Sequence, residues 1–169
     1  MHNRLTTFVR LDRDLLRTRY PVTEAALTRR PGAIWRACRA VAGCDLVFGW
    51  FASWHTLGPL LAARRLGKRS LLVIGGYDLA CLPDIGYGQQ RGGLRRLVSR
   101  AALRVADCLV TNAEFSRREA EQNAGVPPGR VRVIYHGLAD PLGALPAAPR
   151  RRQALTVGDV NRGNLARKG

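Results

Sequence analysis

The fold can be predicted from one stretch, Leu71-Leu72-Val73-Ile74-Gly75-Gly76-Tyr77-Asp78. Its four consecutive apolar residues follow the basic pair Lys68-Arg69 and predict a short strand that is buried on both faces. The two glycines then allow a sharp turn and a close approach of the backbone to a ligand. Ligands of open α/β sheets bind at the carboxyl ends of the strands. Tyr77 and Asp78 add an aromatic face and a carboxylate at that edge, although a tight turn ending in a surface aspartate would explain the same residues.

Strand and helix patterns alternate on both sides of this stretch. The sequence predicts strands at residues 45–51, 70–74, 108–111 and 131–135, and helices at 31–42, 54–66 and 94–105 and before residue 124. This alternation is typical of βαβ units and predicts an α/β fold with a Rossmann-like parallel sheet flanked by helices. The last helix has a candidate capping box, Thr111 with Glu114. Before Leu11 no clear strand is recognisable, so either residues 4–8 form a poor strand or the first strand is missing.

Composition and charge narrow the class of protein. The chain has 169 residues, of which 46% are hydrophobic, and this is enough to bury a core. No apolar run approaches the ~20 residues of a membrane helix, and residues 1–10 lack a signal-peptide core, so a cytoplasmic location is expected. The formal net charge is +16, and all but two of the 28 basic residues are arginine. A protein with this positive charge attracts anionic membranes, small anions and nucleic acid. A biased base composition of the gene would also explain the many arginines.

The cysteines and histidines show no metal-binding pattern. The four cysteines, Cys38, Cys44, Cys81 and Cys108, contain no C-x-x-C pair. The three histidines, His2, His55 and His136, are far apart in sequence. We therefore predict free thiols and no structural metal.

The predicted helix over residues 94–105 is amphipathic. Its apolar residues share one face: Leu94, Leu97, Val98, Ala101 and Val105. The other face carries most of a set of arginines: Arg91, Arg95, Arg96, Arg100 and Arg104. These arginines could form a solvated face, contact an anionic membrane surface or bind nucleic acid. We favour the membrane over nucleic acid, because no aromatic residues are interleaved with the arginines and no nucleic-acid-binding motif is present.

Two stretches lack a regular pattern. Residues 80–93 form a long, glycine-rich connection, which indicates a functional or mobile loop. Residues 141–152 are rich in proline and end in three arginines, as expected of a linker. A new strand pattern begins after this linker, but the chain ends before a second unit could form.

Several motifs occur in a characteristic order. Asp45-Leu46-Val47 enters a strand, Leu66-Gly67-Lys68 precedes the next, and Gly75-Gly76-Tyr77-Asp78 follows it. Three more motifs follow: Ala106-Asp107-Cys108-Leu109-Val110-Thr111-Asn112, then Val126-Pro127 with Arg130-Val131-Arg132-Val133-Ile134, then Leu155-Thr156-Val157-Gly158 with Arg167-Lys168-Gly169. This order resembles the N-terminal half of a glycosyltransferase of family 4 (group 1) with the GT-B fold. His136-Gly137 stands where that family usually has Asn-Gly.

The resemblance implies two Rossmann-like domains that face each other across a cleft. Residues 1–140 would be the acceptor-side domain, 141–152 the Pro/Arg-rich linker, and 153–169 the truncated start of the donor-binding domain. The paired glutamates that this family places in its donor site, spaced E-x7-E, lie in a region that the sequence does not contain. The chain is therefore expected to be a fragment that transfers no sugar alone.

The resemblance also implies an activity. The whole enzyme would transfer a hexosyl group from a nucleotide-sugar donor to an acceptor hydroxyl with retention, in polysaccharide or glycolipid synthesis. No metal and no cofactor are expected. The expected partners are the nucleotide sugar, a carbohydrate or lipid-linked acceptor, and an anionic membrane on whose inner face the protein would be peripheral; nucleic acid is not expected. The alternative is a non-enzymatic Rossmann-like binding module with affinity for polyanions.

The candidate site residues follow from these positions. We predict acceptor binding by His55, Gly75, Gly76, Tyr77 and Asp78. His55 follows a strand on the ligand side of the sheet, although a residue at the start of a helix, packed beside Trp54, would also explain it. His136 and Gly137 are predicted on the donor-phosphate side of the cleft. No residue is predicted to be catalytic.

Overall fold

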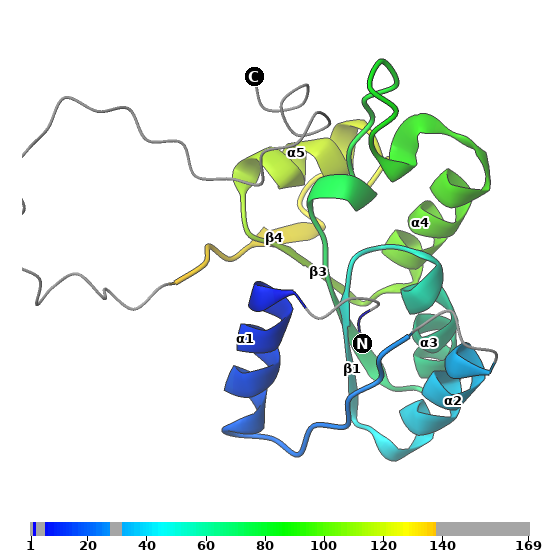
Figure 1. The fold of residues 1–169 in the computed structure, drawn as a ribbon, viewed down its shortest axis with the longest axis vertical. Coiled ribbons are helices and arrows are strands. Elements are labelled where there is room, and N and C mark those ends of the chain that lie inside the picture. The colour runs from blue at the N-terminus through cyan, green and yellow to red at the C-terminus, as the bar shows by residue number, and fades with distance from the viewer. Residues whose placement is uncertain (1, 3–5, 28–31, 138–169) are drawn as a thin grey trace, which may run out of the picture. The chain divides into compact units, whose positions relative to one another are not determined.

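The computed structural model describes residues 2, 6–27 and 32–137, and its core is one four-stranded sheet (Figure 1). The strands are β1 (Leu46–Trp50), β2 (Arg69–Val73), β3 (Cys108–Thr111) and β4 (Val131–Val133). They are all parallel and lie in the order β1-β2-β3-β4. The predicted Rossmann-like parallel sheet is therefore confirmed.

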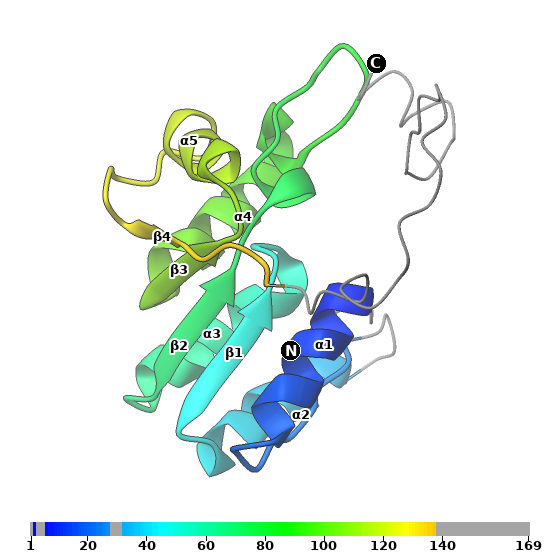
Figure 2. The same cartoon turned by 90° about the vertical axis from the view of Figure 1, so that its left-hand side faces the viewer.

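Helices cover both faces of this sheet. The crossovers are α3 (Trp54–Arg65), α4 (Gly93–Val105) and α5 (Glu114–Gln122), each between two consecutive strands. Because neighbouring strands follow one another in the chain and such crossovers are right-handed, these three helices lie on one face. The opposite face carries α1 (Thr7–Arg17) in front of β1 (Figure 2). The helix α2 (Ala33–Ala40) and the turn η1 (Val41–Gly43) lead into β1.

Alternating side chains of the strands supply two cores. Val47, Leu72 and Leu109 point to the side of α3, α4 and α5, where they join the larger cluster of buried residues. Trp50 and Val73 point to the other side and pack with Val9 of α1. This two-sided burial explains the unbroken apolar run over residues 71–74.

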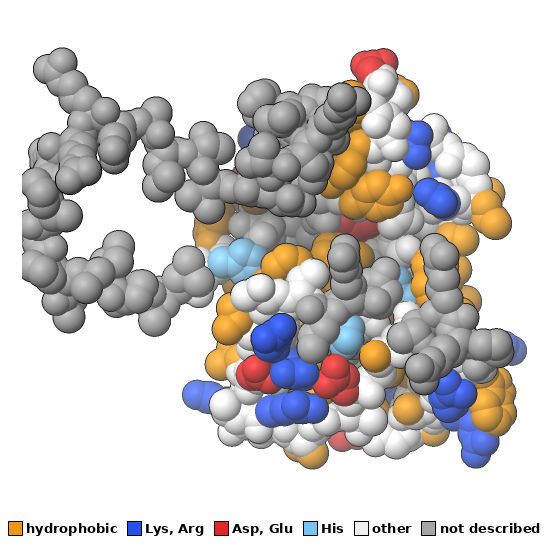
Figure 3. All heavy atoms as spheres, viewed as in Figure 1, with side chains coloured by type: hydrophobic (Ala, Val, Ile, Leu, Met, Phe, Trp, Pro, Cys, Tyr) orange, Lys and Arg blue, Asp and Glu red, His pale blue; other side chains and the backbone are white. Residues whose placement is uncertain are grey.

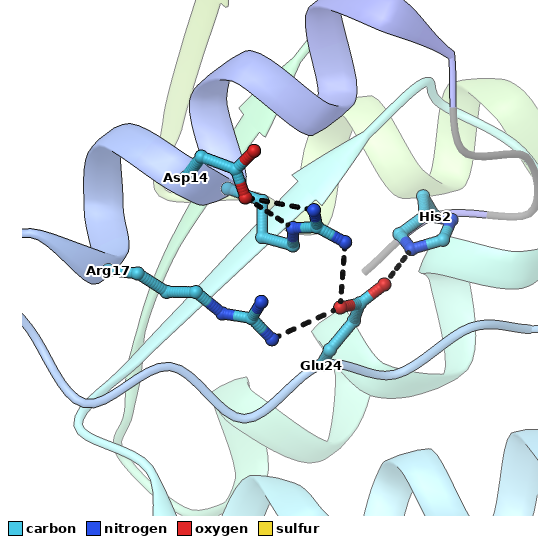
Figure 4. A network of polar contacts seen from close by, with 5 residues as sticks. His2, Asp14, Arg17 and Glu24 are labelled. Carbon is cyan, nitrogen blue, oxygen red and sulfur yellow. Dashed lines mark hydrogen bonds and ion pairs between the residues drawn. The ribbon is translucent and has the colours of Figure 1, made fainter.

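An ionic network ties α1 to the segment that follows it (Figure 4). Glu24 lies 2.9 Å from Nε2 of His2 and accepts hydrogen bonds from Arg13 and Arg17 at 3.4 and 3.3 Å. The hydrogen bond with His2, with help from Arg13, lowers the pKa of Glu24. His2 also forms a parallel bridge with Ala26.

Of the two alternatives for the start of the chain, a poor strand over residues 4–8 is wrong at the end of that range. Thr7 and Phe8 lie in the first turn of α1, and residues 3–5 are outside the described residues. The side chain of Phe8 stacks on Trp50 at 5.0 Å between ring centroids, so the helix rather than a strand brings it to the sheet.

The buried face of α4 differs from the predicted apolar face. Ser99, Ala102 and Leu103 are buried, whereas Leu94 and Leu97 are 75% and 66% exposed. Here α4 packs against α3, and the small side chains of Ser99 and Ala102 allow the two helices to approach closely. The periodicity marked a second apolar stripe, which the described part of the chain leaves uncovered.

The candidate capping box of α5 is also wrong. The helix begins at Glu114 after Ala113, and Ala113 makes no side-chain capping bond. Glu114 instead accepts a 2.7 Å hydrogen bond from Arg117. The hydroxyl of Thr111 is buried and has no partner among the described residues.

The glycine-rich connection between β2 and α4 is ordered by its own hydrogen bonds. Leu82 and Tyr87 exchange two backbone hydrogen bonds of 3.0 Å, which close a hairpin over residues 82–87. A Cβ on Gly88 would overlap with the carbonyl group of Ala80, so only glycine fits there. Two short 3-10 turns flank the hairpin, η2 (Gly76–Asp78) and η3 (Gln89–Arg91).

Two compact units divide the chain, residues 1–135 and 136–169. The predicted linker at 141–152 and the predicted domain start at 153–169 lie outside the described residues. Among the described helices, none is long and apolar enough to cross a membrane.

Candidate functional site

The site lies at the carboxyl edge of the sheet, where the chain leaves β1 and β2. The strand β2 is prolonged by Ile74, whose amide donates to Val110 of β3 at 2.8 Å. Gly75 and Gly76 then take φ angles of +156° and +71°, which residues with a side chain rarely adopt. Beside them Phe51, the first residue after β1, is also at a positive φ of +66°. The two loops form a rim of the type at which α/β proteins bind ligands.

Asp78 joins these two loops. Its side chain is 1% exposed; Oδ2 accepts a 2.8 Å hydrogen bond from the amide of Ala52, and Oδ1 accepts a 3.1 Å bond from the amide of Gly75. Burial raises the pKa of Asp78 to about 7, although both amide bonds favour the charged form. The carboxylate is thus held by backbone groups beneath the rim. This arrangement favours the alternative of a tight turn over direct contact with an acceptor, although the aspartate is buried and not at the surface.

The main chain of Asp78 is held as well. Its carbonyl oxygen accepts hydrogen bonds from Nε2 of Gln90 at 2.7 Å and from the hydroxyl of Ser99 at 3.3 Å. Gln90 is 2% exposed and also donates to Ser99 at 2.9 Å. Sequence analysis missed Gln90 and Ser99, because nothing in their local pattern distinguishes a buried polar partner from a surface residue.

His55 is fully buried at the start of α3. Its Nε2 lies 2.9 Å from the carbonyl oxygen of Trp50, so Nε2 carries the proton in this pair, since a carbonyl only accepts. Burial lowers the pKa of His55, so the ring is neutral at pH 7. Nδ1 is buried without a partner among the described residues. This environment favours the packed-helix alternative, and a role of His55 in acceptor binding stays a prediction.

Gly76 and Tyr77 are the exposed part of the rim. A Cβ on Gly76 would have no atom within 4 Å, so the backbone there faces open space. Tyr77 is 38% exposed, and its ring meets that of Tyr87 in the hairpin edge to face at 5.1 Å. The structure therefore brings an accessible backbone and an aromatic pair together at one place.

Polar side chains from the end of β3 and the start of α5 approach Gly75. A Cβ on Gly75 would lie 3.6 Å from the hydroxyls of Thr111 and Ser116 and 3.9 Å from Oδ1 of Asn112. Thr111 ends β3, the neighbour of β2, and the other two residues follow it; the carboxyl ends of adjacent parallel strands meet at one edge. By that rule, their position at the end of a strand pattern predicts them at the site.

His136 and Gly137 are exposed and belong to the second compact unit. Their predicted part in a donor-phosphate contact stays a prediction.

The predicted basic face of α4 is used in part for internal contacts. Nε of Arg91 donates to the carbonyl of Gly88 at 3.1 Å, and Nη2 of Arg100 donates to that of Asn123 at 2.8 Å. Partial burial and the neighbouring Arg96 and Arg104 lower the pKa of Arg100. A shallow hollow of about 350 Å³ lies at the start of the helix and is lined by Gly92, Gly93, Arg96, Leu97 and Arg100. No acidic side chain pairs with these arginines in the described part of the chain, and Arg95 and Arg104 are exposed.

No metal centre is visible among the described residues, which contain no group of three or more potential ligands. The four cysteines are free.

Comparison with known proteins defines the class to which this sheet and rim belong. The family model Glycosyltransferase Family 4 matches residues 7–140, which is most of the chain. The chain therefore belongs to glycosyltransferase family 4, and the resemblance inferred from the motifs is confirmed. No curated protein matches the sequence.

Among solved structures, the chain is similar to HepE of Anabaena, crystallised in complex with UDP. The TM-score is 0.52 at 18% sequence identity, and the match covers 75% of this chain. It covers 34% of HepE, so this chain spans about a third of that protein. At this identity the likeness supports the Rossmann-like fold.

Proposed function

We propose that this domain forms the acceptor side of a retaining glycosyltransferase, which transfers a hexosyl group from a nucleotide sugar to an acceptor hydroxyl in polysaccharide or glycolipid synthesis. The observation that carries the proposal is the family match over residues 7–140 together with the exposed rim at Gly76 and Tyr77. The UDP complex of HepE supports a nucleotide-sugar donor. Donor binding would need a second domain, so the chain alone should transfer no sugar. The proposed reaction requires no metal or other cofactor.

Within this site the roles differ by exposure. Gly76 offers its backbone and Tyr77 an aromatic face to a sugar ring, because both are accessible. Gly75, Asp78 and His55 would support them from below. His136 and Gly137 are proposed to face the donor phosphate in the whole enzyme.

Acceptor binding can be tested on this chain by NMR titration with methyl glucoside, methyl mannoside and methyl galactoside. At least one glycoside should shift the signals of Gly76 and Tyr77, with a Kd in the millimolar range. Tyr77→Ala should weaken this binding on the order of tenfold, which corresponds to the loss of about 1.4 kcal/mol from one aromatic contact. The matched control is Tyr20→Ala, since Tyr20 is 62% exposed beyond the end of α1.

Two results would count against the proposal. The first is equal glycoside affinity in wild type and Tyr77→Ala. The second is no glycoside binding together with tight, steeply salt-dependent binding to heparin, which would favour the alternative of a polyanion-binding module.

A membrane surface is proposed as a further partner. Leu94 and Leu97 project from α4 beside its arginines, and Leu82 and Ile85 of the hairpin are each 41% exposed. Nη1 of Arg91 would lie 3.7 Å from a Cβ on Gly86, so this arginine connects the hairpin tip to the start of α4. Hydrophobic and basic side chains are neighbours over this region (Figure 3). Apolar residues among arginines suit an interface with anionic headgroups, and peripheral attachment to the inner membrane face would bring lipid-linked acceptors to the rim.

A further inference from the structure

Asp78 connects two loops that follow different strands. One carboxylate oxygen accepts a hydrogen bond from the amide of Ala52, which follows β1. The other accepts a hydrogen bond from the amide of Gly75, which follows β2. Asp78 is separated from Ala52 by 26 residues. This side chain therefore joins the two loops, beside the 2.8 Å backbone hydrogen bond from the amide of Phe51 to the carbonyl of Val73.

The main chain of Asp78 cannot adjust freely. Gln90 of η3 and Ser99 of α4 both donate to its carbonyl oxygen, and all three residues are buried. If the hydrogen bonds of the carboxyl group change, the amides of Ala52 and Gly75 must therefore move rather than the main chain of Asp78. The Gly75 amide is the weaker partner, because its bond is 3.1 Å and that of Ala52 is 2.8 Å.

We propose that Asp78 is a positioning residue for the rim, and that protonation of its carboxyl group releases the Gly75 amide and loosens the Gly75-Gly76 turn. An ionised carboxylate only accepts hydrogen bonds, so it satisfies both amides. A protonated carboxyl group carries an O–H on one oxygen, and the amide facing that oxygen loses a charge-assisted bond.

The groups around the Asp78 carboxylate have opposing effects on its charged form. Burial opposes its charge, whereas the amides of Ala52, Gly75 and Asp78 itself favour it. Glu119 of α5 repels it, and the pKa of Asp78 is raised to about 7. Burial also raises the pKa of Glu119, whereas His55 of α3 is uncharged at this pH. Among the described residues no arginine, lysine or histidine is hydrogen-bonded to the Asp78 carboxylate. Both protonation states are thus populated near pH 7.

This inference rests on the proposed function only in naming the rim as the acceptor site. The coupling between the carboxyl group and the turn can be measured without any ligand.

The test is an NMR titration of the intact chain from pH 5 to pH 9. The carboxyl carbon of Asp78 and the amide of Gly75 should titrate with one common midpoint near neutral pH. After correction for intrinsic exchange, hydrogen-exchange protection of Gly75 should fall on the order of tenfold below the midpoint. In Asp78→Asn the Gly75 amide should lose its titration.

Glu119→Gln provides a variant that leaves the buried bonds intact. Removing this negative charge should shift the common midpoint to lower pH. The matched control is Glu114→Gln on the same helix, since Glu114 is paired with Arg117, and it should leave the midpoint in place. A Gly75 amide that does not follow Asp78, or that still titrates in Asp78→Asn, would overturn the inference. So would a midpoint that Glu119→Gln leaves unchanged, which keeps the test decisive if Asp78→Asn does not fold.

Discussion

Asp78 and His55 act in the site through hydrogen bonds to backbone groups. The sequence alone could predict these two residues but not the groups to which they bind. The glycines and Asp78 stand out as a turn after an apolar run. That the carboxylate meets the amide of Ala52 depends on the pairing of β1 with β2, which brings distant residues together. His55 shows the same limit, because the sequence gives its position after β1 but not its complete burial.

Gly88 is the residue at which the hairpin is most sensitive to substitution. Gly88→Ala should lower the free energy of unfolding by at least about 2 kcal/mol, because the new Cβ overlaps with the backbone of Ala80 and φ is +103°. Denaturant unfolding followed by circular dichroism measures this change. The control is Gly129→Ala. Gly129 has a φ of +78°, but a Cβ there would have no atom within 4 Å, so this variant should lose about 1 kcal/mol of the free energy of unfolding. Equal losses in both variants would contradict the steric account.

At the scale of elements, the strands were predictable and the packing of the helices was only partly so. Apolar runs bounded by glycine or charged residues mark β1 to β4 within one or two residues at most ends. The face of α4 that is buried was not predictable from periodicity, because its two small buried residues are less apolar than the exposed leucines. The hairpin between β2 and α4 could not be foreseen either, since its pairing is limited to Leu82 and Tyr87.

Mutual hydrogen bonds between Ser70 and Asp107, called here the Ser70–Asp107 bracket, join the amino ends of β2 and β3. Oδ2 of Asp107 accepts 2.8 Å hydrogen bonds from both the amide and the hydroxyl of Ser70, and the amide of Asp107 donates to that hydroxyl at 3.0 Å. Asp107→Ala should destabilise the domain by about 2 kcal/mol, because the buried amide of Ser70 loses its acceptor.

Chemical denaturation of this variant is best compared with Asp45→Ala. Asp45 is exposed directly before β1, and no side-chain hydrogen bond of it is found in the described part of the chain, so its loss should be within about 0.5 kcal/mol. A double-mutant cycle with Ser70→Ala should give a coupling energy of at least about 0.5 kcal/mol. Additive effects would show that the bracket does not stabilise the pair of strands.

At the scale of the whole molecule, the family could be predicted because the order of motifs along the chain mirrors the order of strands in the sheet. Asp107 belongs to one of these motifs. Its hydrogen bonds with Ser70 give a structural reason for an aspartate at this position. Composition alone could not assign a partner to the charge of +16, because membranes, small anions and nucleic acid are all attracted to it.

Membrane attachment can be tested by sedimentation of the chain with liposomes. Binding should be strong with vesicles containing phosphatidylglycerol and weak with pure phosphatidylcholine. The double variant Leu94→Gln/Leu97→Gln should bind anionic vesicles at least about fivefold less, since it removes the two exposed apolar side chains of α4. Leu15→Gln, at a 68% exposed position on α1, is the control. Equal binding to both kinds of vesicle, or equal loss in the control, would exclude this surface.

The sequential strand order β1-β2-β3-β4 has a consequence for how the domain is made. Each strand pairs with the strand synthesised immediately before it, and the intervening helix packs on the same face as the previous one. Structure can therefore grow one strand and helix at a time as the chain leaves the ribosome, without waiting for a distant segment. In contrast, the two bonds of Asp78 close only when β1, β2 and the turn after them are all present, so the rim is completed with the second strand rather than with the first.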